Sequence, residues 1–306
     1  MVYFMITLKQ IIELFFIIFL GYIAFKKNIV TEESKKSFSG ILINIVVPAV
    51  IINSFQSQQD LSKLKSLLFA FFLAVFVHIF LIILSSLIIR KSSGPNYKLE
   101  RVACIYSNAG FMGIPLLSAL FGENGAFYAS LYVVVFNVFL WTQGVWSLTG
   151  FAEKGDGFKG IIKKLTTPTI ISVIFSFILY ILQIRLPEMI LEPIRYVADM
   201  NTPFAMLVTG ITIASAGVHG IFNKRIGYIV FLKQFILPAA LVFVFRLLGF
   251  VDETSVCILV TAICPSAAMI PMMALQYDQD EKAASGIFVF STLISLISVP
   301  LFMLFI

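Results

Sequence analysis

Long apolar stretches alternate with short polar segments along the whole chain. A membrane-spanning helix needs about 20 apolar residues, and on this measure the pattern predicts ten spans. The predicted spans are 5–25, 38–56, 65–89, 101–120, 125–149, 166–184, 195–217, 226–248, 255–276 and 282–305. We therefore expect an all-α polytopic membrane protein, with both termini on the same side of the membrane because the number of spans is even.

The fourth predicted span contains residues that interrupt a membrane helix. The string from Ser107 to Pro115 reads Ser-Asn-Ala-Gly-Phe-Met-Gly-Ile-Pro, with Asn108, Gly110 and Gly113 inside it. A proline removes one intrahelical hydrogen bond and clashes with the preceding turn, and lipid supplies no replacement partner. A broken helix at this depth is typical of a binding site.

The ninth predicted span repeats this feature. Ile-Pro recurs at 270–271, at an offset of 156 from Ile114-Pro115, and Cys264-Pro265-Ser266 precedes it. Nearly the same offset relates Asn44-x-x-x-Pro48 to Asp199-x-x-x-Pro203, and His78 to Gln234. These pairs divide the chain into two halves of five spans. An odd number of spans per half inverts one half relative to the other, as in many secondary transporters.

Composition agrees with a membrane protein: 59% of the 306 residues are hydrophobic and 12% are charged, and the mean hydropathy is +0.99. The net charge of +6 comes from basic residues in short loops, so we expect no nucleic-acid partner. With the termini outside, fifteen of the 22 basic residues lie in cytoplasmic loops. The positive-inside rule therefore predicts a multi-pass protein of the cell membrane with both termini extracytoplasmic.

Motifs for other chemistry are missing from the sequence. Cys104, Cys257 and Cys264 form no CxxC pair and have no neighbouring histidine, which argues against a metal site or a disulfide. There is no HExxH, GxSxG, Walker lysine motif or pair of carboxylates within one span. We therefore expect no enzyme, no catalytic residue, no metal and no cofactor.

The string Asn108-x-x-x-Met-Gly-Ile-Pro-Leu-Leu117 resembles one found in the auxin efflux carrier family, which includes plant PIN exporters and bacterial relatives described as malate or malonate permeases. The resemblance implies a fold like that of the bile-acid sodium symporters, in which spans 4 and 9 are broken and cross. It also implies scaffold segments 1–57 and 166–218, which form a homodimer, and transport segments 58–150 and 219–306, which move as an elevator. The polar segment 151–165 would be a cytoplasmic loop.

A broken helix exposes free N–H groups and a positive dipole end, which suit a carboxylate. Asn108 is our first candidate ligand, although its amide could instead bond carbonyls freed by Pro115. Lys233, a charge within an apolar run, either attracts the anion or pairs with a buried group. Asn137 either reaches the substrate or joins helices. The predicted substrate-binding set is Ser107, Asn108, Asn137, Lys233 and Ser266, and the predicted crossover residues are Gly110, Gly113, Pro115, Pro265 and Pro271.

Three titratable residues are candidates for ion or proton coupling: His78, Asp199 and Glu13. A lone buried histidine is more often a packing residue, and the two carboxylates are more often solvated or cap a helix. Neither interrupted segment contains an acidic residue.

The function that follows is a secondary carrier of small organic anions, either auxin-like monocarboxylates or malate-type dicarboxylates. We expect alternating access of the elevator type around the crossover. An anion channel and a membrane receptor that binds the anion without moving it are the alternatives that the sequence leaves open.

Overall fold

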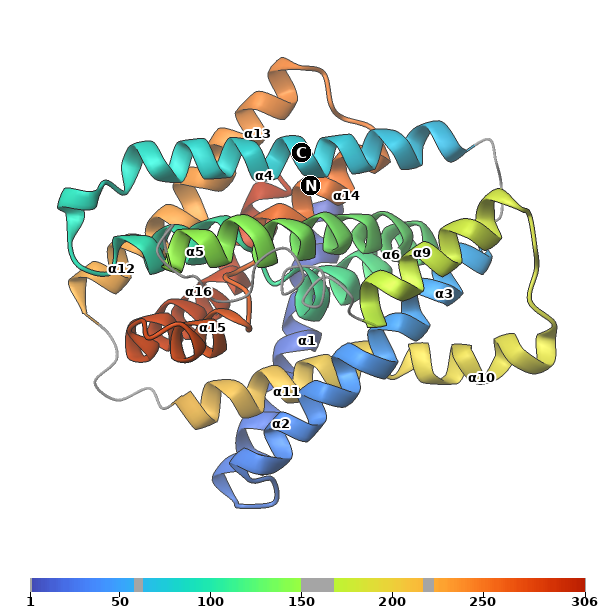
Figure 1. Ribbon diagram of the computed structural model, residues 1–306, viewed down its shortest axis with the longest axis horizontal. Coiled ribbons are helices and arrows are strands. Elements are labelled where there is room, and N and C mark those ends of the chain that lie inside the picture. Colours follow the sequence, from blue (N-terminus) through green and yellow to red (C-terminus); the bar gives the residue numbers. More distant parts are fainter. Residues whose placement is uncertain (1, 58–62, 150–167, 217–222, 306) are drawn as a thin grey trace.

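A computed structural model describes residues 2–57, 63–149, 168–216 and 223–305. These ranges are helical apart from short connections and contain no β-strand (Figure 1). The predicted cytoplasmic loop 151–165 lies outside them. The chain is therefore all-α wherever it is described, as its apolar stretches predict.

Most predicted spans coincide with continuous helices. These are α1 (Val2–Lys26), the run of α2 (Glu32–Ile41), η1 (Leu42–Val46) and α3 (Val47–Ser57), α4 (Leu64–Ile88), α9 (Pro168–Ile181), α10 (Glu188–Asp199) with α11 (Asn201–Ala216), the run of α12 (Lys224–Phe231), η6 (Leu232–Ile236) and α13 (Leu237–Leu247), and α16 (Glu281–Phe302). The short segments η1 and η6 are turns of π-helix, which occur frequently at functional sites.

Two helices are interrupted where the sequence predicts. The first is α5 (Tyr97–Ile105), which resumes as η4 (Ala109–Gly113) and α6 (Ile114–Phe139), followed by η5 (Leu140–Gly144) and α7 (Val145–Thr149). The second is α14 (Glu253–Ile263), which resumes as α15 (Ile270–Gln276). Pro115 and Pro271 each occupy the first turn of the resumed α-helix, where a missing N–H costs nothing. The gap in each helix thus lies several residues before its proline.

The chain reverses direction at Gly122, within α6. Gly122 has φ 58° and ψ −140°, values outside the helical range, and glycine adopts positive φ without strain. A Cβ on Gly125 would lie 2.1 Å from the carbonyl oxygen of Leu117, although residues eight apart in a straight helix are separated by about 12 Å. The predicted boundary between spans 101–120 and 125–149 corresponds to this reversal.

Among the described residues, seven helical stretches are long and apolar enough to cross a membrane. Two further apolar helices, Pro168–Ile181 and Glu253–Ile263, are shorter. One of the seven, Ala109–Thr149, contains the reversal at Gly122. The structure is that of a polytopic membrane protein, while the count of ten spans in two inverted halves stays a prediction.

Close packing between α1 and α11 depends on two glycines. A Cβ on Gly210 would lie 1.9 Å from the carbonyl oxygen of Ile18, and one on Gly21 would lie 2.2 Å from that of Leu207. Small residues allow such close approach of membrane helices. Elsewhere, α3 packs against α9 and α10, while α6 packs against α4 and α14 (Figure 1).

The beginning and the end of the chain lie at the same end of the helix bundle. Leu8 and Ile12 of α1 line one hollow together with Leu296, Ile297, Pro300 and Leu301 of α16. This position of the two ends agrees with an even number of spans.

Candidate functional site

The two helix interruptions meet and are joined by their main chains. Ser107 and Ser266 form an antiparallel bridge. The Asn108 N–H donates to the Pro265 carbonyl at 2.7 Å, and the Ala267 N–H donates to the Tyr106 carbonyl at 3.0 Å. Part of the backbone freed by each break therefore finds partners in the other break, which is how irregular backbone is accommodated within a membrane protein.

Two backbone N–H groups remain open at the start of the resumed helix. The Asn108 carbonyl accepts from the N–H groups of Met112 and Gly113, at 2.9 and 3.0 Å. The N–H groups of Gly110 and Phe111 have no acceptor among the described residues. Because the first N–H groups of a helix carry its positive dipole end, this turn presents donors to any adjacent anion.

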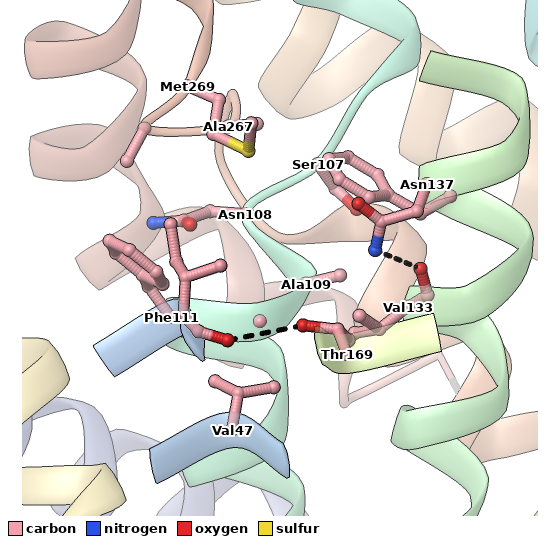
Figure 2. A pocket seen from close by; sticks show the side chains of 14 residues that line it. Val47, Ser107, Asn108, Ala109, Phe111, Val133, Asn137, Thr169, Ala267 and Met269 are labelled. Atoms are coloured by element: carbon pink, nitrogen blue, oxygen red, sulfur yellow. Dashed lines mark hydrogen bonds between the residues drawn. The ribbon is translucent and has the colours of Figure 1, made fainter. Parts of the chain in front are cut away.

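These donors border a pocket of about 490 Å³, called the central pocket here (Figure 2). Three sets of residues line it: the first interruption, the second interruption, and side chains from η1, α3, α6 and α9. They are Ser107, Asn108, Ala109, Gly110 and Phe111; Ala267, Ala268 and Met269; and Ile43, Val47, Val133, Phe136, Asn137 and Thr169. The lining is mainly apolar with few polar groups, as in small-molecule sites.

The Asn108 amide is a side-chain donor that has no partner in the central pocket. Its side chain lies between Phe111 and the Ala267–Met269 segment (Figure 2), and the residue is only 4% exposed. Its Nδ2 has no hydrogen-bond partner in the described part of the chain. The alternative role, in which this amide bonds carbonyls freed by Pro115, is therefore not observed.

Comparison with known proteins identifies the chain. A family model described as membrane transport protein matches residues 6–303. The chain belongs to this family. The resemblance to auxin efflux carriers, inferred from the Asn108–Leu117 string, is thereby confirmed.

Two relatives of this membrane transport protein cover nearly the whole chain, and a third covers 77% of it. An uncharacterized transporter of Methanocaldococcus jannaschii is 27% identical over 301 residues, covering 94% of this chain and 95% of that protein. One of Methanothermobacter thermautotrophicus is 23% identical over 303 residues, covering 97% and 98%. The uncharacterized transporter YfdV of Escherichia coli is 21% identical over 246 residues, 77% of each chain. None of these names specifies a substrate.

Of the other predicted ligands of the transporter, Ser107 and Asn137 line the central pocket and Ser266 does not. The Asn137 Nδ2 donates to the Val133 carbonyl, one turn earlier in the same helix, at 2.8 Å (Figure 2). The Ser107 hydroxyl donates to the Tyr132 hydroxyl at 3.5 Å. The Ser266 N–H donates to the Ser291 Oγ at 3.1 Å, and the Ser266 Oγ is buried without a partner in the described residues.

Lys233 of the transporter lies outside the lining of the central pocket. It is 2% exposed, and its Nζ donates to the Cys104 carbonyl at 3.1 Å. That carbonyl belongs to the last turn of α5, where a positive charge offsets the negative helix end. This contact supports pairing with a buried group, the second of the two roles considered from sequence.

The predicted crossover residues have distinct positions. Gly110 lines the central pocket, and a Cβ there would meet no atom within 4 Å. Gly113 faces α14, since its Cβ would lie 3.1 Å from the Thr261 Cγ2. Pro265 supplies the carbonyl that accepts from Asn108. The crossover group is therefore divided between the pocket and the packing that supports it.

The three candidates for coupling lie apart. His78 is fully buried against the rings of Tyr132 and Phe139, with centroids 4.8 and 5.2 Å away. Its Nδ1 lies 2.8 Å from the Ala74 carbonyl, and its Nε2 has no partner in the described residues. Glu13 is exposed on α1, 3.8 Å from Lys9, and Asp199 borders a different cavity. In the described residues no three acidic, histidine or cysteine side chains are placed to hold a metal ion.

Sequence reasoning missed the residues that face the interruptions from η1, α3 and α9. Ile43, Val47 and Thr169 line the central pocket, and the Thr169 hydroxyl donates to the Ile43 carbonyl at 3.3 Å. The proximity of Thr169 to Pro168, at the start of a predicted span, was the available signal. The two aliphatic residues have none, because they are indistinguishable from other apolar positions.

Proposed function

We propose that the protein is a secondary transporter of small organic anions, and that the central pocket binds the carboxylate. The observation that carries this proposal is the Asn108 amide, which is 4% exposed, borders the pocket and has no partner for Nδ2 in the described chain. A buried donor left unpaired costs about 1–3 kcal/mol. A carboxylate oxygen would remove that cost.

The central pocket offers an anion neutral hydrogen-bond donors and no acidic side chain that would repel it. The lining residues include no acidic and no basic side chain, so the attraction comes from neutral donors: the Asn108 amide and the N–H groups of Gly110 and Phe111. A carrier must release what it binds, and ion pairs in a low dielectric are strong. Neutral donors at a helix terminus hold a carboxylate while allowing it to leave.

An elevator mechanism between inverted halves is the transport cycle that we propose. Its support is that the central pocket has walls of two kinds: Ile43, Val47 and Thr169 from the predicted scaffold, and the two interruptions from the predicted transport segments. The interruptions run antiparallel where they meet, as inverted halves require. Movement of the transport segments along the scaffold would expose the pocket to each side in turn.

Flux of a labelled carboxylate into proteoliposomes tests this function. We expect saturable uptake of malonate or of an auxin-like acid, and a loss of affinity of about tenfold to hundredfold in Asn108→Ala, because a hydrogen bond to a charged group contributes about 1.5–3 kcal/mol. Asn44→Ala is the matched control, since Asn44 is an exposed amide on η1 outside the pocket lining.

Three outcomes would contradict the proposal. Equal flux in wild type and Asn108→Ala would remove the assigned ligand. Flux that does not saturate and that appears as single-channel current would identify a channel. Binding without flux would identify a receptor.

A further inference from the structure

A second cavity, of about 670 Å³, lies between α3, α6 and the corner formed by α10 and α11. We call it the acidic cavity. Its lining residues are Val50, Asn53, Ser54, Ser118, Gly122, Glu123, Ala126, Ala198, Asp199, Asn201 and Thr202. They include two carboxylates and several amide and hydroxyl groups but no basic side chain, in a protein whose net charge is +6.

One lining residue points to a ligand. Asn201 is 3% exposed, and its Oδ1 has no hydrogen-bond partner in the described residues. An acceptor buried in this way is satisfied only by a donor or a cation, and leaving it unpaired costs about 1–3 kcal/mol. The carboxylate of Asp199, two residues earlier in the chain, lines the same cavity.

We propose that the acidic cavity binds a monovalent cation of the Na⁺ class, with the Asp199 carboxylate and the Asn201 Oδ1 as ligands. Oxygen ligands suit hard cations. A divalent ion is less well matched, because in the described residues no three side chains of the acidic, histidine or cysteine type form a cluster. Glu123 lines the same cavity from the α6 side.

The position of this site links it to the central pocket. Val47 of α3 lines the central pocket, while Val50 and Asn53 of the same helix line the acidic cavity. Helix α6 likewise contributes residues to both cavities. If occupation of one site changes how α3 and α6 pack, the affinity of the other site changes, and the coupling is reciprocal. This coupling rests on the proposed anion function, whereas cation binding itself does not.

Thermal unfolding of the purified full chain, without any organic anion, tests the cation site. The probe is NaCl titrated against choline chloride at constant ionic strength. We expect a saturable rise in Tm with Na⁺, and in Asp199→Asn a midpoint about tenfold or more higher, because an ionised ligand is lost. Asn201→Ala should act in the same direction.

Asp278→Asn is the matched control, and we expect it to keep the wild-type midpoint. Asp278 is exposed, follows α15 and lies outside the cavity lining, and its φ of 51° is one that asparagine adopts readily. Because Asp199 is also exposed, its variant should fold even if Asn201→Ala does not.

Equal Tm values in Na⁺ and choline would overturn the proposal, as would a wild-type midpoint in Asp199→Asn. A shift that follows pH and not Na⁺ would replace the cation with a proton and overturn it as well. Flux that depends on Asn108 but is equal in Na⁺ and choline would leave the carrier function standing and would overturn the coupling between the two sites. A saturable rise in Tm with Na⁺, in the absence of flux that depends on Asn108, would leave the cation site standing and overturn the carrier function.

Discussion

Asn108 contributes to the structure through its main chain, which leaves its side chain available for a ligand. Its N–H donates to Pro265 across the bridge, and its carbonyl accepts from the first turn of the resumed helix. The side-chain Nδ2 meets no acceptor among the described residues. Substitution of the amide should therefore change binding more than folding, which is why Asn108→Ala is an informative variant.

Lys233 should behave as a positioning residue. In Lys233→Met the Cys104 carbonyl, which accepts from Nζ at 3.1 Å, loses its donor, and a buried group left unpaired costs about 1–3 kcal/mol. We expect a lower Tm and an equal loss of affinity for monoanions and dianions, measured by competition in the flux assay. Lys233→Arg, which keeps a donor, should recover part of the stability.

A greater loss for dianions than for monoanions would contradict this prediction. That result would mean that the Lys233 charge attracts the substrate directly, although the side chain lies outside the lining of the central pocket.

At the scale of helices, the contact between α1 and α11 should be intolerant of a single methyl group. In Gly210→Ala the new Cβ would lie 1.9 Å from the Ile18 carbonyl oxygen, so the helices must separate, at a cost of about 1–3 kcal/mol. Thermal unfolding in detergent should show the lower Tm. Gly40→Ala is the control, because its Cβ would meet only the Asn44 Nδ2, at 4.0 Å.

An unchanged Tm in Gly210→Ala would show that α1 and α11 are packed less closely than the structure indicates. Gly40→Ala should be neutral or slightly stabilising, since alanine is favoured over glycine by up to about 1 kcal/mol within a helix.

The positions of the helix interruptions could be predicted from sequence because glycine, asparagine and proline are exceptional in an apolar run. Their geometry could not. The prolines mark the first turn of each resumed helix, while the joint lies earlier, at Ser107 and Ser266. The contact of Lys233 with Cys104 depends on how two distant helices pack, and no local pattern encodes it.

For the whole molecule, the distribution of basic residues predicts which side of the membrane each loop faces. Met189 is the second residue of α10, and Glu33 lies in α2. In sealed right-side-out vesicles, a membrane-impermeant maleimide should label Met189→Cys, on the predicted external side, and should not label Glu33→Cys, on the predicted cytoplasmic side. Both positions are exposed, and Met189 is 90% exposed. The native Cys104, Cys257 and Cys264 are buried and should give little background.

Inverted vesicles provide the control, because the labelling pattern should exchange. Labelling of both positions from one side would contradict the predicted path of the chain. Labelling of Glu33→Cys alone in right-side-out vesicles would place the termini in the cytoplasm and reverse the positive-inside assignment.

The joint between Ser107 and Ser266 is made by main-chain atoms, and every amino acid carries these atoms. Substitutions at pocket positions such as Phe136 or Asn137 therefore leave the bridge intact while altering what fits beside it. Evolution can therefore change the substrate specificity of a transporter without changing the backbone joint between its two interrupted helices. Relatives that are 21–27% identical to this chain are thus free to share one joint and to differ in substrate.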